Sequence, residues 1–127
     1  MTRSLTMLGT LSTLMTVAAL ATITAFAASP LDGAYHGDSI VTVGVPSTCG
    51  KDFKLTITIN NGAFEYVWDK STNIVIPISA ATDGSLSGER FVSARAGAKA
   101  SGRITGKTLE MDLVGRQCTR HVVVKKA

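Results

Sequence analysis

The chain has 127 residues, of which 45% are hydrophobic and 17% charged, and its formal net charge is +4. This length suits one domain and is too short for two or for most cofactor-binding enzyme folds. The composition is too apolar for a disordered chain, and beyond residue 27 no apolar run approaches the roughly 20 residues that span a bilayer.

Residues 1–27 have the pattern of a secretory signal peptide. Arg3 is the only charged residue before Asp32, and the uncharged stretch between them ends in Ala-Phe-Ala at 25–27. A positive start, an apolar middle and a small-x-small end are typical of such a signal. We therefore expect cleavage after position 27, a periplasmic or secreted protein, and a single β-domain over 28–127 with no transmembrane segment.

The clearest strands are 53–59 and 63–68, where apolar and polar residues alternate. Between them lies an Asn-Gly pair at 61–62, which favours the positive φ angles of a two-residue type I′ turn. Continued pairing from that turn would place Leu55 opposite Trp68 on one apolar face. The pattern therefore predicts a hairpin with Trp68 in the core.

A second hairpin is predicted from the strands 98–104 and 109–113. A Gly-Lys pair at 106–107 fits a type II′ turn, which has Gly at its first central position. The resulting register places Arg103 opposite Glu110 on the outer face, where opposite charges stabilise the pairing.

The remaining strands have weaker patterns. Pro77 lacks a backbone donor, so its strand is expected to lie at a sheet edge or to carry a bulge. Outside the signal peptide no helical period occurs. We expect an all-β fold, an antiparallel meander of about seven or eight strands forming a small barrel or a sandwich. The further strands are 39–45, 73–80, 86–92 and 118–125.

The two cysteines, Cys49 and Cys118, are expected to form one disulfide, because an exported chain meets an oxidising compartment. The alternative is a catalytic cysteine paired with His36 or His121. No reactive-cysteine signature surrounds either thiol, so the disulfide is the prediction.

Residues with catalytic or metal-binding patterns are scarce. His36 and His121 are the only histidines, and neither has a partner at metal-ligand spacing. A site made of His36, Asp38 and His121 would require the first and last strands to meet. The segment 84–88 resembles a nucleophile elbow, but Leu86 stands where that motif needs serine. We predict no catalytic residue, metal or cofactor.

Charge is divided unevenly along the chain: residues 28–87 carry a net charge of −3 and residues 88–127 carry +6. Such a basic half favours an anionic partner. We therefore predict a basic surface that binds an anionic envelope ligand or an acidic protein, with no nucleic acid expected. Its residues are Arg116, Arg120, Lys125 and Lys126.

Short phrases of the sequence resemble a known group. They are the segments 32–37, 83–88 and 102–106 and the late Cys118 before a terminal strand. In these the chain resembles small exported proteobacterial β-domain proteins of unassigned function. The resemblance implies a β-scaffold and supplies no catalytic residue.

The function expected from the sequence is that of an exported, non-enzymatic β-domain that binds a partner or an anionic ligand. Two alternatives remain. One is an inhibitor of a secreted hydrolase, and the other is a small enzyme with a cleft built from histidine and carboxylates. An enzyme should gather such residues in a concave pocket.

Overall fold

The protein is an all-β domain. The computed structural model describes residues 29–94 and 96–127, and the predicted signal peptide lies outside them. Its elements are β1 (Gly33–Val43), one helical turn α1 (Pro46–Cys49), β2 (Phe53–Ile59), β3 (Ala63–Asp69), β4 (Ile74–Ala80), β5 (Ser85–Phe91), β6 (Gly97–Thr105), β7 (Thr108–Gly115) and β8 (Thr119–Lys126).

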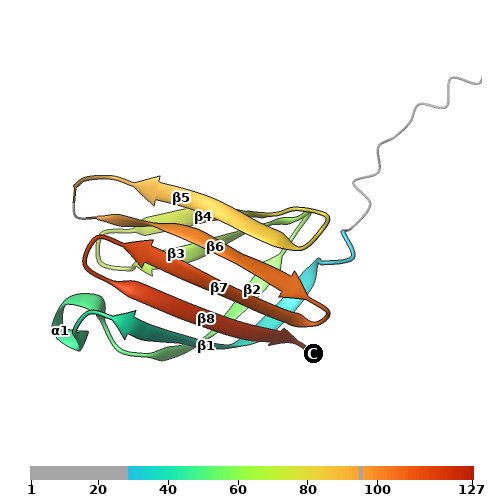
Figure 1. Ribbon diagram of the computed structural model, residues 1–127, viewed down its shortest axis with the longest axis horizontal. Helices are drawn as coiled ribbons and strands as arrows, with labels where there is room; N and C mark the ends of the chain where they lie inside the picture. Colours follow the sequence, from blue (N-terminus) through green and yellow to red (C-terminus); the bar gives the residue numbers. More distant parts are fainter. Residues whose placement is uncertain (1–28, 95) are drawn as a thin grey trace, which may run out of the picture.

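The strands form one antiparallel sheet in the order β2-β1-β8-β7-β6-β5-β4-β3, curled into a nearly closed barrel (Figure 1). The first and last strands of the chain meet, with Gly37 opposite Val124. From β3 to β8 each strand pairs with the next along the chain, as a meander requires. The predicted fold class is confirmed, and the barrel is the observed form.

The second predicted hairpin is confirmed in its register. Ile104 pairs with Leu109, and Arg103 pairs with Glu110. Gly106 has a φ of 61°, as the first central position of a type II′ turn requires. Local turn chemistry and side-chain alternation therefore determine this part of the sheet.

The first predicted hairpin is correct at its turn and wrong beyond it. Asn61 and Gly62 have φ angles of 53° and 72°, as a type I′ turn requires. However, the only pairing across it is the bridge from Asn60 to Ala63. β2 then pairs with β1 and β3 with β4, so Leu55 does not lie opposite Trp68. A two-residue turn fixes only the first pair of residues beside it. Beyond that pair, β2 and β3 separate because each pairs with a different neighbouring strand.

Asp32 fastens this turn to the start of β1. Its carboxylate accepts hydrogen bonds from the backbone N–H groups of Asn61 and Gly62, at 2.8 and 3.0 Å. These bonds, with the one from Gly62 foremost, lower the pKa of Asp32. The closed end of the gap between β2 and β3 is thereby held in place.

Pro77 lies in β4, which was expected to be an edge strand or to carry a bulge. In the structure β4 is an interior strand, between β5 and β3. It pairs with Glu65 of β3, and the β4–β5 ladder includes only Ser79 and Ala80 of β4. Hydrogen-bonded and non-hydrogen-bonded pairs alternate along an antiparallel ladder. The residues on either side of Pro77 direct their backbone groups toward β3, so the donor that Pro77 lacks would face β5. The ladder toward β5 ends where that donor is absent, and the register shift lies instead in β3, between Val67 and Asp69.

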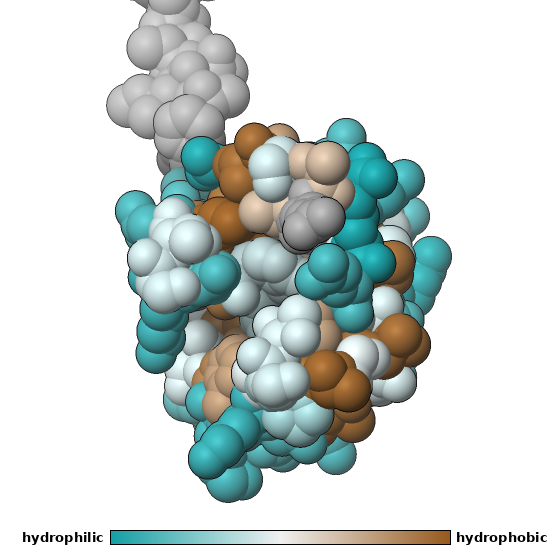
Figure 2. Space-filling model, turned by 90° about the vertical axis from the view of Figure 1, so that its left-hand side faces the viewer, coloured by the Kyte–Doolittle hydropathy of each residue, from teal (hydrophilic) through white to brown (hydrophobic). Residues whose placement is uncertain are grey.

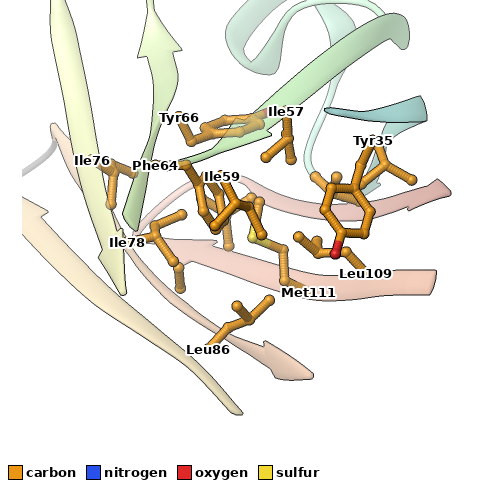
Figure 3. Packing of buried hydrophobic residues seen from close by; sticks show 14 of the residues in the cluster. Tyr35, Ile57, Ile59, Phe64, Tyr66, Ile76, Ile78, Leu86, Leu109 and Met111 are labelled. Carbon is orange, nitrogen blue, oxygen red and sulfur yellow. The ribbon is translucent and has the colours of Figure 1, made fainter. Parts of the chain in front are cut away.

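The inner face of the barrel is packed with aliphatic and aromatic side chains from all eight strands (Figure 3). Gly37 lies on this face between Tyr35 and Ser39, which are both fully buried. A Cβ at Gly37 would meet the carbonyl oxygen of Val123 and the Cα of Val124. The close approach of β1 and β8 therefore depends on glycine at this position.

We predict that Gly37→Ala destabilises the fold by about 1–3 kcal/mol, because a methyl group there overpacks the contact with the β8 backbone. Thermal unfolding followed by circular dichroism measures the effect. Ala34→Ser, at an exposed position of the same strand, is the control and should stay within about 0.5 kcal/mol of the wild type. Equal stability of both variants would contradict the tight approach.

Candidate functional site

A pocket of about 600 Å³ lies where β2 and β3 have separated, at the end of the barrel that carries α1. Figure 2 faces this end, whose surface mixes hydrophilic and hydrophobic residues. Phe53 from β2 and Val67 and Trp68 from β3 supply its apolar walls, and Arg120 from β8 borders it. Its size falls within the range of small-ligand sites.

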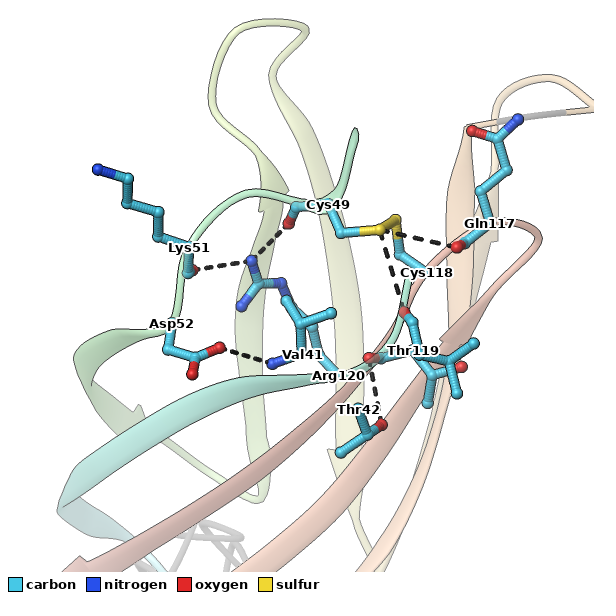
Figure 4. The surroundings of a disulfide bond; sticks show 10 residues. Val41, Thr42, Cys49, Lys51, Asp52, Gln117, Cys118, Thr119 and Arg120 are labelled. Carbon is cyan, nitrogen blue, oxygen red and sulfur yellow. Dashed lines mark hydrogen bonds between the residues drawn. A yellow bond between two sulfur atoms is a disulfide. The ribbon is translucent and has the colours of Figure 1, made fainter. Parts of the chain in front are cut away.

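Arg120 is the central charged group of this pocket. It is only 4% exposed. Its Nη2 donates to the backbone carbonyls of Cys49 and Lys51, the second at 3.0 Å, as Figure 4 shows. The guanidinium also lies over the Phe53 ring, 4.9 Å from the ring centre. It therefore joins β8 to the segment between α1 and β2.

Arg120 is also bonded into the barrel interior. Its Nη1 donates to Ser39 Oγ at 3.3 Å, and Ser39 Oγ lies 2.8 Å from the Tyr66 hydroxyl. Burial raises the pKa of Tyr66, which is therefore a neutral phenol at neutral pH. This polar chain links β8, β1 and β3 beneath the pocket.

No carboxylate pairs with Arg120 among the residues that the structure describes. The nearby acids have other partners: Asp52 accepts from the Val41 backbone N–H, and Asp69 accepts from both the backbone and the hydroxyl of Ser71. The Ser71 hydroxyl is the main cause of the lowered pKa of Asp69. A buried cation with only neutral acceptors is costly, so this arrangement favours an added anion.

The predicted disulfide between Cys49 and Cys118 is present, with the two Cα atoms 5.6 Å apart. It joins α1 to the loop before β8, and both cysteines line the pocket. The disulfide and Arg120 thus fix one wall of the pocket together. Neither thiol is available as the nucleophile that the alternative interpretation needed.

The four basic residues predicted as one surface lie at two ends of the barrel. Arg120 faces inward with Val122 and Val124, and Arg116 is exposed in the adjoining loop. Lys125 is exposed and roughly 17 Å further along the strand. Lys126 reaches the Pro30 carbonyl at 3.4 Å. Only Arg120 therefore borders the pocket, and the expected single patch is not formed.

Several pocket residues were not predicted from the sequence as functional. Phe53 and Trp68 belong to a pattern that indicates core packing, and Val67 belongs to the alternate face of its strand with Ala63 and Glu65. The separation of β2 from β3 has no sequence signal. A usable signal did exist for Arg120. It shares the side-chain alternation of the buried Val122 and Val124, so it was bound to point inward.

His121 lies on the outer face of the barrel, where it contacts two carboxylates. Its Nδ1 lies 2.6 Å from Asp112 and its Nε2 3.0 Å from Glu110. The Asp112 hydrogen bond is the main cause of its raised pKa. Because carboxylates contact both ring nitrogens, the arrangement favours a charged imidazolium over a general base. His36 and Asp38 do line one pocket with His121, of about 410 Å³, as the pairing of β1 with β8 requires.

We predict that stability falls as the pH rises above about 6.5, since a raised histidine pKa stabilises the fold below the unfolded value and the effect is lost through the folded value. The contribution should be less than about 1 kcal/mol, as for other partly exposed pairs. Urea unfolding from acidic to alkaline pH measures it. His121→Gln should lose this slope and His36→Gln should keep it; a slope that survives in His121→Gln would contradict the assignment.

Within the described part of the chain, no helix is long and apolar enough to cross a membrane. Among the same residues, no three His, Cys, Asp or Glu side chains are grouped to hold a metal ion. Comparison with models of known families, with curated proteins and with solved structures gives no match.

Proposed function

We propose that this protein is an exported, non-enzymatic binding domain whose pocket between β2 and β3 takes an anionic ligand with an apolar group. The observation that carries the proposal is Arg120, a buried guanidinium without a carboxylate partner among the described residues, bordering a pocket with aromatic walls. The disulfide supports export, because such bonds persist in oxidising compartments.

The guanidinium retains capacity for a ligand. It has five N–H donors, and Ser39, Cys49 and Lys51 accept from it in three hydrogen bonds. A carboxylate or phosphate oxygen at the remaining donors gains a charge-assisted bond in a partly desolvated setting. The surrounding charges agree with this ligand class. Lys51, Lys54 and Lys70 line the pocket against the single carboxylate of Asp69.

The apolar part of the ligand would lie against Phe53, Val67 and Trp68. Phe53 is 41% exposed and Val67 43% exposed, so a ligand that covers them removes apolar surface from water. The contrary interpretation is that Arg120 serves only to hold the carbonyls of the 49–51 segment. The two interpretations differ in whether a negative charge on the ligand matters.

The chain has a built-in reporter, since Trp68 is its single tryptophan and lines the pocket. We predict that 3-phenylpropionate changes Trp68 fluorescence saturably. The neutral 3-phenylpropionamide, which matches it in shape, should bind about 10–100-fold more weakly, as expected for loss of a hydrogen bond to a charged group.

Variants of β8 provide the matched control. Arg120→Gln should remove the preference for the acid over the amide, whereas Lys125→Gln, at the other end of the strand, should leave it unchanged. Circular dichroism spectra establish that both variants are folded. Equal affinity of the wild type for acid and amide would contradict the proposal without reference to any variant.

A further inference from the structure

The pocket lies between two sheet edges. β2 is paired only with β1, and β3 only with β4, so each strand has one side without a partner strand within residues 29–94 and 96–127. These two edges meet at the bridge between Asn60 and Ala63 and diverge toward the α1 end of the barrel. The pocket is lined by residues of both strands.

The orientation of the backbone groups at these edges follows from the bridge. Asn60 and Ala63 exchange two backbone hydrogen bonds, of 2.9 and 3.1 Å. Since N–H and C=O groups of alternate residues point to the same side of a strand, the residues at even steps from each also face the gap. These are Thr58, Thr56 and Lys54 of β2 and Glu65 and Val67 of β3.

An open edge with free donors and acceptors is a template for a further strand. Recognition of extended peptides by strand addition takes its affinity from main-chain hydrogen bonds and its specificity from pockets for alternate side chains. Here the edge at Val67 adjoins the pocket that holds Arg120. A small ligand would leave the backbone groups at this edge unused, whereas an extended peptide would pair with them.

The charge of the pocket selects the kind of peptide. Arg120, Lys51 and Lys70 lie on its walls, while Asp69 is engaged by Ser71. We propose that the ligand class of this pocket is an extended acidic peptide segment of a partner protein. It adds as a strand to the free edge of β3 and places a carboxylate at Arg120. This inference rests on the proposed function, which it narrows to one class of ligand.

The first test uses a synthetic peptide with the wild-type protein. The probe is acetyl-Val-Glu-Val-Thr-Val-Asp with a free carboxyl terminus, and Trp68 fluorescence reports binding. We expect it to bind at least 10-fold more tightly than the same peptide with Lys in place of Glu and Asp. A version N-methylated at alternate residues, which lacks the pairing donors, should also bind at least 10-fold more weakly.

The second test changes the edge of the protein. Glu65→Pro removes an N–H that faces the gap and leaves the β3–β4 hydrogen bonds in place, because proline is tolerated where the N–H side of a strand is open. Glu65 does not line the pocket, so this variant should lose peptide binding and keep the binding of 3-phenylpropionate. Glu65→Gln, which also removes the charge but retains the N–H, should keep both. If Glu65→Pro does not fold, the N-methylated peptide decides the question alone.

The outcomes separate the two proposals. If N-methylation does not weaken the binding of the peptide, while 3-phenylpropionate still binds more tightly than its amide, the inference of strand addition is overturned and the proposal of an anion pocket stands. The same holds if the acidic peptide does not bind and 3-phenylpropionate does. If acid and amide bind equally, both proposals fail. Tight binding of the acidic peptide, together with weak binding of its N-methylated and basic versions, would support strand addition.

Discussion

The backbone hydrogen bonds that β2 and β3 do not make to each other determine the character of this molecule. Every other pair of neighbours in the strand order shares a ladder, and the sheet lacks closure only at this position. Had the hairpin continued from the turn at Asn61 and Gly62, the barrel would close and the gap between β2 and β3 would be absent. The open gap instead creates a pocket with polar backbone edges.

Arg120 makes that gap chemically specific. Its Nη1 donates to Ser39, which in turn bonds Tyr66 inside the barrel. Its Nη2 donates to the backbone carbonyl of Cys49, in the segment that the disulfide joins to the loop before β8. Replacing Arg120 would therefore remove the hydrogen bonds to this segment and the buried cation of the pocket at the same time. The ligand's charge, not only the residue, therefore has to be varied if structural and binding roles are to be distinguished.

The sequence predicted most of the fold, because alternation and turn chemistry are local. The hairpin of β6 and β7 was correct to the residue, since Gly106 and the pair of Arg103 and Glu110 specify one register. The separation of β2 from β3 was not predictable, because a turn cannot report which other strand each arm meets. Pro77 gave the right cause, a missing donor, but the wrong position in the sheet.

The candidate site required the same non-local information. The basic residues near the end of the chain looked alike in the sequence, yet β8 turns Arg120 into the barrel and leaves Lys125 in water. Their net charge predicts an anionic partner, and the burial of one of them is the basis of our proposal for the place where that anion binds. Total charge therefore suggests only a class of partner, which stays a prediction. The proposed site depends on a single arginine, because desolvation strengthens one interaction far more than screened surface charges do.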